Sequence, residues 1–226
     1  MTSSHRVIGP MGIKAMVVVL AGTLSACSST TYVPYSEDRT AQNQSLVRTI
    51  AFDVDPQFEA FPPSCVVTIV VADEPVESLS QVIDSAVRRH LSERVDDVVD
   101  PRRKNEKLQG LLISLNSSVE RRILASELSC DHILEVRLLE SDIKFAGVMS
   151  YARLGLDLQL VRARDGRPRW RASHVATRIG GSPPFSLISA PLSAAQSFLM
   201  ASDNELLPSM VDDVVRRIMT TFPDTA

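Results

Sequence analysis

The sequence predicts an α/β protein in which helices pack on one mixed sheet, and three observations indicate this fold class. A continuous β-branched run at residues 66–71 is typical of a strand buried on both faces, and apolar residues at helical spacing follow it. Residues 132–138 and 152–160 alternate between apolar and polar side chains, as strands do. An amphipathic helix ends the chain. We therefore expect parallel N-terminal strands, an antiparallel C-terminal meander and helices packed on the sheet.

Residues 1–26 have the pattern of a lipoprotein signal peptide. The basic residues Arg6 and Lys14 precede an apolar run at 15–24, which is about half the length that a bilayer span requires. The segment that begins at Met11 is already a sufficient basic region, so a start at Met1 or at Met11 fits the pattern.

Leu24-Ser25-Ala26-Cys27 resembles a bacterial lipobox, in which the cysteine is acylated and becomes the mature N-terminus. The resemblance implies that Cys27 carries lipid, palmitate included, and anchors the protein to a membrane. Ser28 stands where an inner-membrane retention signal has aspartate. By analogy with Gram-negative sorting, this indicates the outer membrane, with the protein facing the periplasm. The alternative is an ordinary secretory signal with an incidental cysteine.

The mature part has 226 − 26 = 200 residues, enough for one domain and a tether. Without Arg6 and Lys14, the 24 basic residues fall to 22 against 27 acidic ones, a net charge of −5. This weak acidity argues against nucleic acid as a partner. The polar segment 27–47 predicts a flexible tether behind the lipidated cysteine, and residues 48–226 predict one periplasmic domain.

Cys65 and Cys130 are the cysteines that remain besides Cys27. Each precedes a predicted strand, and parallel strands would place both at the same end of the sheet. Disulfides persist in exported proteins, so the pair is a candidate disulfide. Two buried free thiols are the alternative.

The first elements of the domain follow from side-chain spacing. Residues 48–52 suit a strand, although Pro56, Pro62 and Pro63 interrupt what comes next. A short strand is predicted at 95–99. The helix before it is indicated by the apolar residues Leu79, Ile83, Ala86, Val87 and Leu91.

The later elements begin with a charged segment at 101–107, which precedes a second helical region. Ser117 and Glu120 have the spacing of a capping box at the start of that helix. Asp165-Gly166 is a hairpin signal, after which one strand face carries Trp170, Ala172 and His174. The final helix has the apolar stripe Leu207, Met210, Val211, Val214, Ile218 and Phe222.

Residues 127–134, Glu-Leu-Ser-Cys-Asp-His-Ile-Leu, resemble the helix-to-strand step of the TolB N-terminal-domain and CsgG-like lipoprotein group. The hairpin at 158–170 and the segment 180–186 are similar to the same group. The chain departs from it at Ser129-Cys130, where the group has Gly-Ala. The resemblance covers about residues 65–222 and implies an α/β fold and an accessory role in the cell envelope. Some members form oligomeric rings in export systems, and others activate wall synthesis.

We expect no enzyme, metal or cofactor. His90 lies beside two arginines on a predicted helix, which suits a solvated or helix-end role. Asp131-His132 has no second His or Cys at ligand spacing, so Asp131 is expected to accept hydrogen bonds from amides at the start of a strand. The sequence contains no nucleophile elbow, zinc-protease motif or phosphate loop.

Five arginines crowd the hairpin around Asp165-Gly166: Arg162, Arg164, Arg167, Arg169 and Arg171. The last three alternate, so we expect them to share a strand face opposite Trp170. They are a candidate contact for anionic head groups or glycan. The alternative is a solvated edge strand that its charges protect from aggregation.

Residues 183–200 carry no charge and three prolines, and they are too apolar for a disordered loop. A short helix at 193–200 would cover the sheet. Alternatively the segment forms an assembly surface toward a second subunit or the bilayer, presented by Phe185, Leu187, Ile188, Phe198, Leu199 and Met200.

These observations predict a non-enzymatic outer-membrane lipoprotein. We expect it to be an accessory or assembly component of a cell-envelope export or wall-maintenance complex, through self-association or contact with envelope proteins. The alternative is a periplasmic lipoprotein that binds a lipid or glycan, with residues 183–200 as a lid.

Overall fold

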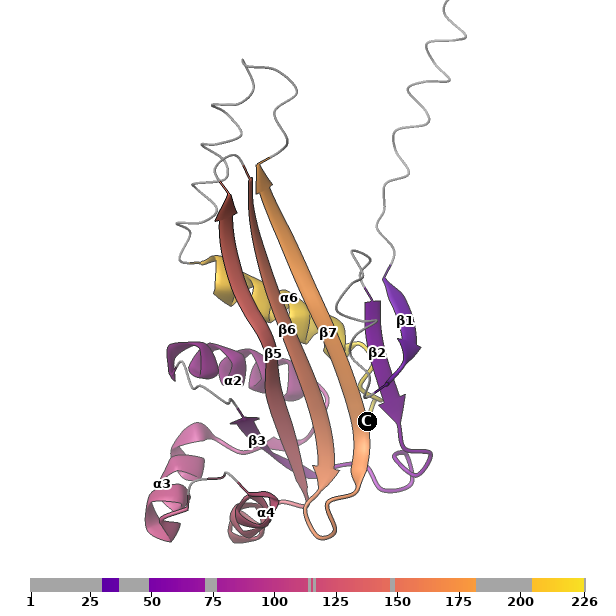
Figure 1. Cartoon of the computed structure of the whole chain (residues 1–226). Coiled ribbons are helices and arrows are strands. Elements are labelled where there is room, and N and C mark those ends of the chain that lie inside the picture. Colours follow the sequence, from indigo (N-terminus) through magenta and orange to yellow (C-terminus); the bar gives the residue numbers. More distant parts are fainter. Residues whose placement is uncertain are drawn as a thin grey trace, which may run out of the picture. The chain divides into compact units, whose positions relative to one another are not determined.

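A seven-stranded mixed sheet, covered by helices on both faces, organises the chain (Figure 1). The structure is a computed structural model that describes residues 30–36, 49–71, 77–113, 115, 117–146, 149–181 and 205–225. The strands are β1 Thr31–Pro34, β2 Thr49–Val54, β3 Cys65–Val71, β4 Asp97–Val98, β5 His132–Ala146, β6 Met149–Arg162 and β7 Pro168–Gly181. The helices are α2 Glu77–Leu91, α3 Pro101–Leu111, α4 Ser118–Glu127 and α6 Leu206–Met219.

The strand order is β1-β2-β7-β6-β5-β3-β4. Strands β3, β4 and β5 are parallel neighbours, whereas β5, β6 and β7 form the antiparallel meander. The predicted fold class is therefore confirmed. At the other edge, β2 pairs antiparallel with β7, and β1 pairs parallel with β2.

The β-branched run in β3 is explained by the two apolar layers that it separates. Val66 and Val70 face the layer under α2 and α6, whereas Val67 and Ile69 face the layer under α4. The first layer also contains every second residue of β6 and the buried indole of Trp170. The position of a residue in the alternating pattern of a strand thus decides whether α2 and α6 cover its side chain or α3 and α4 do.

Local signals set the helix starts on the second face. The predicted capping box is present: the Glu120 amide donates to Ser117 Oγ at 3.1 Å, and the Ser117 amide donates to Glu120 Oε2 at 3.0 Å. The charged segment 101–107, which was expected to precede a second helical region, is itself part of a helix, α3. Asp100 caps that helix, and Pro101 stands at its first turn.

The N-terminal edge of the sheet also differs from the expectation. Residues 31–34, assigned to the flexible tether, form β1, because Tyr32 packs edge-to-face on Phe52 of β2 with ring centroids 6.1 Å apart. Next in the chain, the Tyr35 hydroxyl donates to Asp157 Oδ1 at 2.9 Å. The tether prediction therefore fails for these residues.

Several predicted features lie outside the described residues. They are the signal peptide, Cys27, and the candidate assembly surface Phe185, Leu187, Ile188, Phe198, Leu199 and Met200. Within the described ranges, the helices are all too short or too polar to cross a bilayer.

Candidate functional site

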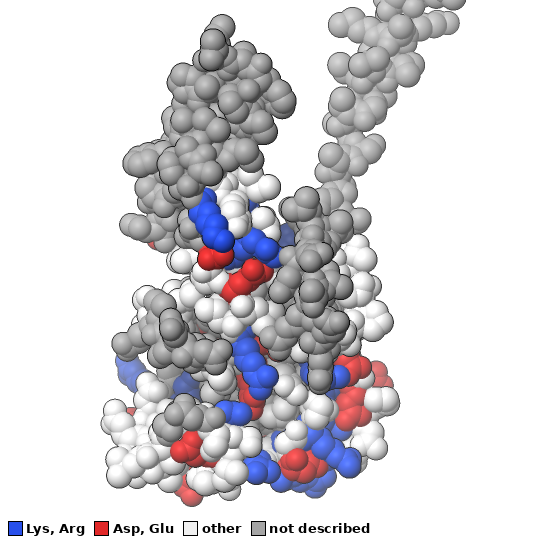
Figure 2. Space-filling model, viewed as in Figure 1, with Lys and Arg blue, Asp and Glu red and all other residues white. Residues whose placement is uncertain are grey.

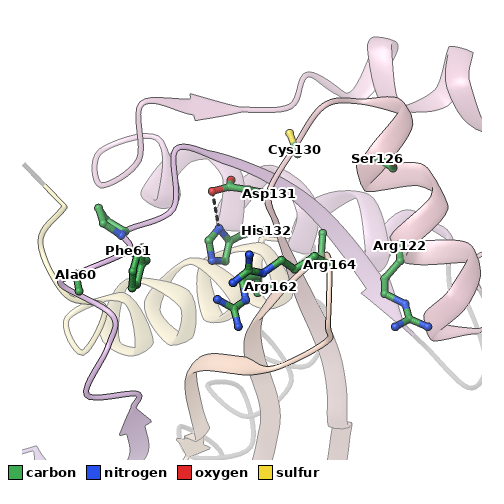
Figure 3. Close-up of a pocket in the computed structure, with 11 residues that line it drawn as sticks. Ala60, Phe61, Arg122, Ser126, Cys130, Asp131, His132, Arg162 and Arg164 are labelled. Atoms are coloured by element: carbon green, nitrogen blue, oxygen red, sulfur yellow. Dashed lines mark ion pairs between the residues drawn. The ribbon is translucent and has the colours of Figure 1, made fainter.

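A pocket of about 620 Å³ lies at the end of the sheet where β5 begins and β6 ends. Four segments build it: the chain between β2 and β3, helix α4, the first residues of β5 and the β6–β7 turn. Its lining contains three arginines and one aspartate (Figure 3). The lining residues are Ala60, Phe61, Pro62, Arg122, Ser126, Cys130, Asp131, His132, Arg162, Ala163 and Arg164.

The end of α4 directs the chain into this pocket. The Ser129 amide donates to the Ser126 carbonyl at 3.0 Å, and the Cys130 amide donates to the Ala125 carbonyl at 2.9 Å, the pattern of a Schellman motif. Ser129 has φ = 58°, a left-handed conformation that glycine adopts at lower cost.

Cys65 and Cys130 form a disulfide with their Cα atoms 4.9 Å apart. The parallel register that pairs Val66 with His132 places the two cysteines side by side, as the sequence order suggested. The Cys65 amide also donates to Asp131 Oδ1 at 3.1 Å. Asp131 therefore has the predicted role at a strand start, and it joins β3 to β5 beside the disulfide.

His132 is a buried imidazole, 3 % exposed, and its Nδ1 lies 3.1 Å from Asp131 Oδ2. Burial lowers the His132 pKa below 6.5; Asp131 opposes this shift, and Arg169 and Arg162 add to it. For Asp131, burial raises the pKa, but the Cys65 amide and His132 together lower it on balance. Near pH 7 the ring is therefore neutral, and among the described residues neither of its nitrogens has a hydrogen-bond partner, although Nδ1 lies at ion-pair distance from Asp131.

The lowered His132 pKa predicts a loss of stability in mild acid. Below pH 6.5 the unfolded chain binds a proton at this histidine before the folded chain does, so protonation favours the unfolded state. We expect the Tm to fall between pH 6.5 and 5 and to fall less in a His132→Gln variant. Differential scanning calorimetry across this range measures the difference. Equal slopes for both proteins would contradict the expectation.

The pocket arginines differ in their partners. Arg162 donates through Nε to Asp165 Oδ1 at 3.1 Å and through Nη2 to Asp165 Oδ2, which lowers the Asp165 pKa to about 2. Arg122 and Arg164 make no side-chain hydrogen bond or ion pair within the described part of the chain. Figure 3 shows Arg162 and Arg164 beside His132, with Arg122 apart from them on α4.

The predicted anionic-surface contact is only partly at the surface. Arg169 is 1 % exposed, and its Nη1 donates to Asp55 Oδ2 at 2.7 Å. Arg171 pairs with Asp53 at 3.0 Å, and Arg167 is exposed. Arg169 is buried and Arg171 is paired because β2 pairs with β7, so that β7 is not an edge strand. The prediction was therefore wrong for Arg169, and the edge-strand alternative was wrong as well.

Basic side chains gather at the end of the sheet around the β6–β7 turn (Figure 2). The sequence revealed the arginines of this hairpin but not the pocket, because Phe61 and Arg122 reach it from segments far away in the chain. A helix face that carries Arg122 and Ser126 one turn apart is the signal that could have indicated it. Within the described ranges, no three His, Cys, Asp or Glu side chains come together as a metal site would require.

Known proteins of similar structure include bacterial lipoproteins. No family model matches the sequence, and no curated protein matches it. The PelC dodecamer of Paraburkholderia phytofirmans matches at 11 % identity over 76 % of this chain and 94 % of that one, with a TM-score of 0.46. Lipoprotein GNA1162 of Neisseria meningitidis matches at 17 % identity over 70 % of this chain and 100 % of that one, with a TM-score of 0.46. The LpoB C-terminal domain of Salmonella enterica matches at 12 % identity over 50 % of this chain and 82 % of that one, with a TM-score of 0.39. The TolB and CsgG-like resemblance stays a prediction.

Proposed function

We propose that this chain is an exported lipoprotein, anchored to the outer membrane through an acylated Cys27, whose domain is an accessory component of a periplasmic complex. The observation that carries the proposal is the arrangement of its three cysteines. Two of them form a disulfide, which persists in an oxidising compartment, and the third ends the lipobox. Export from the cytoplasm would explain both the disulfide and the lipobox.

The surroundings of the histidines support an accessory role over catalysis. His90 Nε2 lies 2.8 Å from Asp212 Oδ1 and joins α2 to α6. His174 Nδ1 lies 2.8 Å from the Thr49 carbonyl oxygen and joins β7 to β2. Both rings therefore connect elements of the fold, as Asp131 does through the Cys65 amide.

The proposed accessory role includes self-association or contact with an envelope protein. The uncharged, apolar composition of residues 183–200 supports it, because an interface core is depleted of charge. Anchoring also concentrates copies on one membrane, so that a weak contact is populated there.

The test compares the wild-type chain with a Cys27→Ala variant in intact cells. We expect the wild-type protein to take up a palmitate analogue and fractionate with the outer membrane, and we expect the variant to lose both properties. Crosslinking followed by mass spectrometry should find the wild type joined to itself or to an envelope protein, with fewer such products for the variant. A variant that still carries label and stays with membranes would contradict the lipid anchor. A wild-type protein that is recovered only as an uncrosslinked monomer would contradict the accessory role.

A second candidate function is the binding of a small ligand. The arginine-lined pocket favours it, because two of its three guanidinium groups, those of Arg122 and Arg164, make no hydrogen bond or ion pair within the described residues.

A further inference from the structure

The antiparallel meander extends past the rest of the sheet at the end opposite the pocket (Figure 1). The strand pairings place Thr31, at the start of β1, level with Val175 of β7. β7 continues for six more residues to Gly181 (181 − 175 = 6), which is about 20 Å farther along the sheet. We call the meander from the level of Thr31 outward the meander tip; its residues are 140–146, 149–155 and 175–181.

Thr31 is also close in the chain to the proposed anchor. Four residues separate it from Cys27 (31 − 27 = 4), and a fully extended chain spans at most about 14 Å over this length. The meander tip therefore extends farther from Thr31 than this tether can reach. When an acylated Cys27 holds Thr31 this close to a bilayer, an end of the sheet that points toward the membrane reaches the lipid head groups.

The direction of β1 favours the meander tip over the end of the sheet that carries the pocket. β1 runs toward the pocket, so the chain enters this strand from the side of the tip. A tether directed to the pocket would have to turn back along the sheet. Trp170 lies five residues from Val175 in that direction (175 − 170 = 5), about 17 Å, and the β6–β7 turn lies beyond it. The tether would thus end short of the pocket.

Three directly paired residues form a row across the meander tip. Lys144 of β5 pairs with Tyr151 of β6, which pairs with Ile179 of β7, so their side chains share one face of the sheet. Ile179 is 59 % exposed, and so is the side chain of Lys144. Lys144 Nζ lies 5.7 Å from the centroid of the Tyr151 ring. A lysine, a tyrosine and an exposed aliphatic side chain together are typical of the interface between a membrane and water.

We propose that the meander tip lies against a lipid bilayer with anionic head groups. Ile179 and the ring of Tyr151 enter the head-group region, and the Lys144 ammonium contacts lipid phosphates. The tip has three basic residues against two acidic ones, a net charge of +1, whereas the mature chain has −5. An anionic bilayer attracts such a local excess of positive charge. This inference rests on the proposed anchor at Cys27.

Quenching of tryptophan fluorescence by brominated lipids tests the contact. The single tryptophan of the chain, Trp170, is buried and lies nine residues along β7 from Ile179 (179 − 170 = 9), about 30 Å away. Ile179→Trp therefore adds a reporter at the tip. The acylated protein is reconstituted into vesicles of phosphatidylcholine and phosphatidylglycerol, with or without bromine on the acyl chains. We expect bromine to remove about half or more of the added fluorescence and to leave the wild-type fluorescence unchanged.

Phe61→Trp is the matched control for position. Phe61 is 61 % exposed and lines the pocket at the opposite end of the sheet, so a tryptophan there should not be quenched. Quenching at 61 without quenching at 179 would show that the pocket faces the bilayer and would overturn the proposal. If Ile179→Trp does not fold, Tyr151→Trp places the reporter in the same row and should give the same result.

Two lysine variants test the role of charge in the Ile179→Trp protein. Lys144→Gln should reduce the quenching at least about twofold, because it removes a cation from the contact. Lys107→Gln removes the same charge from α3, outside the meander tip, and should leave the quenching unchanged. Equal effects of the two variants would contradict a contact at Lys144.

Flotation of the same vesicles separates this proposal from that of the anchor. Protein that floats with the vesicles but shows no quenching at 179 retains its anchor and overturns the contact of the tip. Protein that lacks acyl groups by mass and does not float overturns the anchor and, with it, the contact.

Discussion

Reduction of the Cys65–Cys130 disulfide is expected to lower the free energy of unfolding by about 4 kcal/mol. The bond closes a loop with a sequence separation of 65 residues, and the loss of that constraint increases the entropy of the unfolded chain. In urea, this corresponds to a fall in the unfolding midpoint of about 2 M. Equilibrium unfolding with and without dithiothreitol, followed by circular dichroism, measures the change.

A Cys65→Ala, Cys130→Ala variant and a Cys27→Ala variant are the matched controls. The double variant should be as unstable without reductant as the reduced wild type, and reductant should not affect it further. Cys27→Ala should keep the full response to reductant, since its two other cysteines still pair. Unfolding midpoints that do not depend on reductant would show that the disulfide does not contribute to stability.

Replacement of Trp170 by alanine is expected to cost about 3–5 kcal/mol of unfolding free energy. The indole is 1 % exposed and packs edge-to-face on Phe222, with ring centroids 5.0 Å apart. Its Nε1 donates to the Thr221 carbonyl at 3.0 Å and so connects the meander to the chain after α6. A fall in Tm of about 10 °C should follow for a domain of this size.

If the alanine variant does not fold, Trp170→Phe still allows the contribution of the indole to the free energy of unfolding to be measured. Phenylalanine retains a ring against Phe222 but loses the donor to Thr221, so we expect a smaller loss of about 1–2 kcal/mol. Differential scanning calorimetry compares the variants. A loss below about 1 kcal/mol for the alanine variant would contradict the packing described for this face of the sheet.

The sheet could be predicted where sequence and packing agree. The predicted alternation of apolar and polar residues in β6 and β7 is found in the structure, because one face of the meander is buried under α2 and α6. The β-branched run in β3 identified a strand covered on both faces, and the spacing of Ser117 and Glu120 identified the start of α4. These signals depend only on residues that are close together in the sequence, so the sequence alone reveals them.

Long-range pairing explains the failures. Thr31–Pro34 is polar enough to suggest a tether, and only its pairing with β2 makes it a strand. Arg169 became buried because Asp55, more than a hundred residues earlier, supplies its counter-charge. The pocket depends on the same kind of proximity, since Phe61 and Arg122 meet the start of β5 only in the fold.

The intact mass of the protein extracted from membranes tests the central claim most directly. The account predicts a chain that begins at Cys27, heavier than the peptide by its acyl groups, and lighter by two hydrogens for the Cys65–Cys130 disulfide. Reductant should add those two hydrogens and leave the acyl mass in place. A chain that retains residues 1–26, or one that begins elsewhere without acyl groups and with both thiols free, would contradict the proposal of an exported lipoprotein.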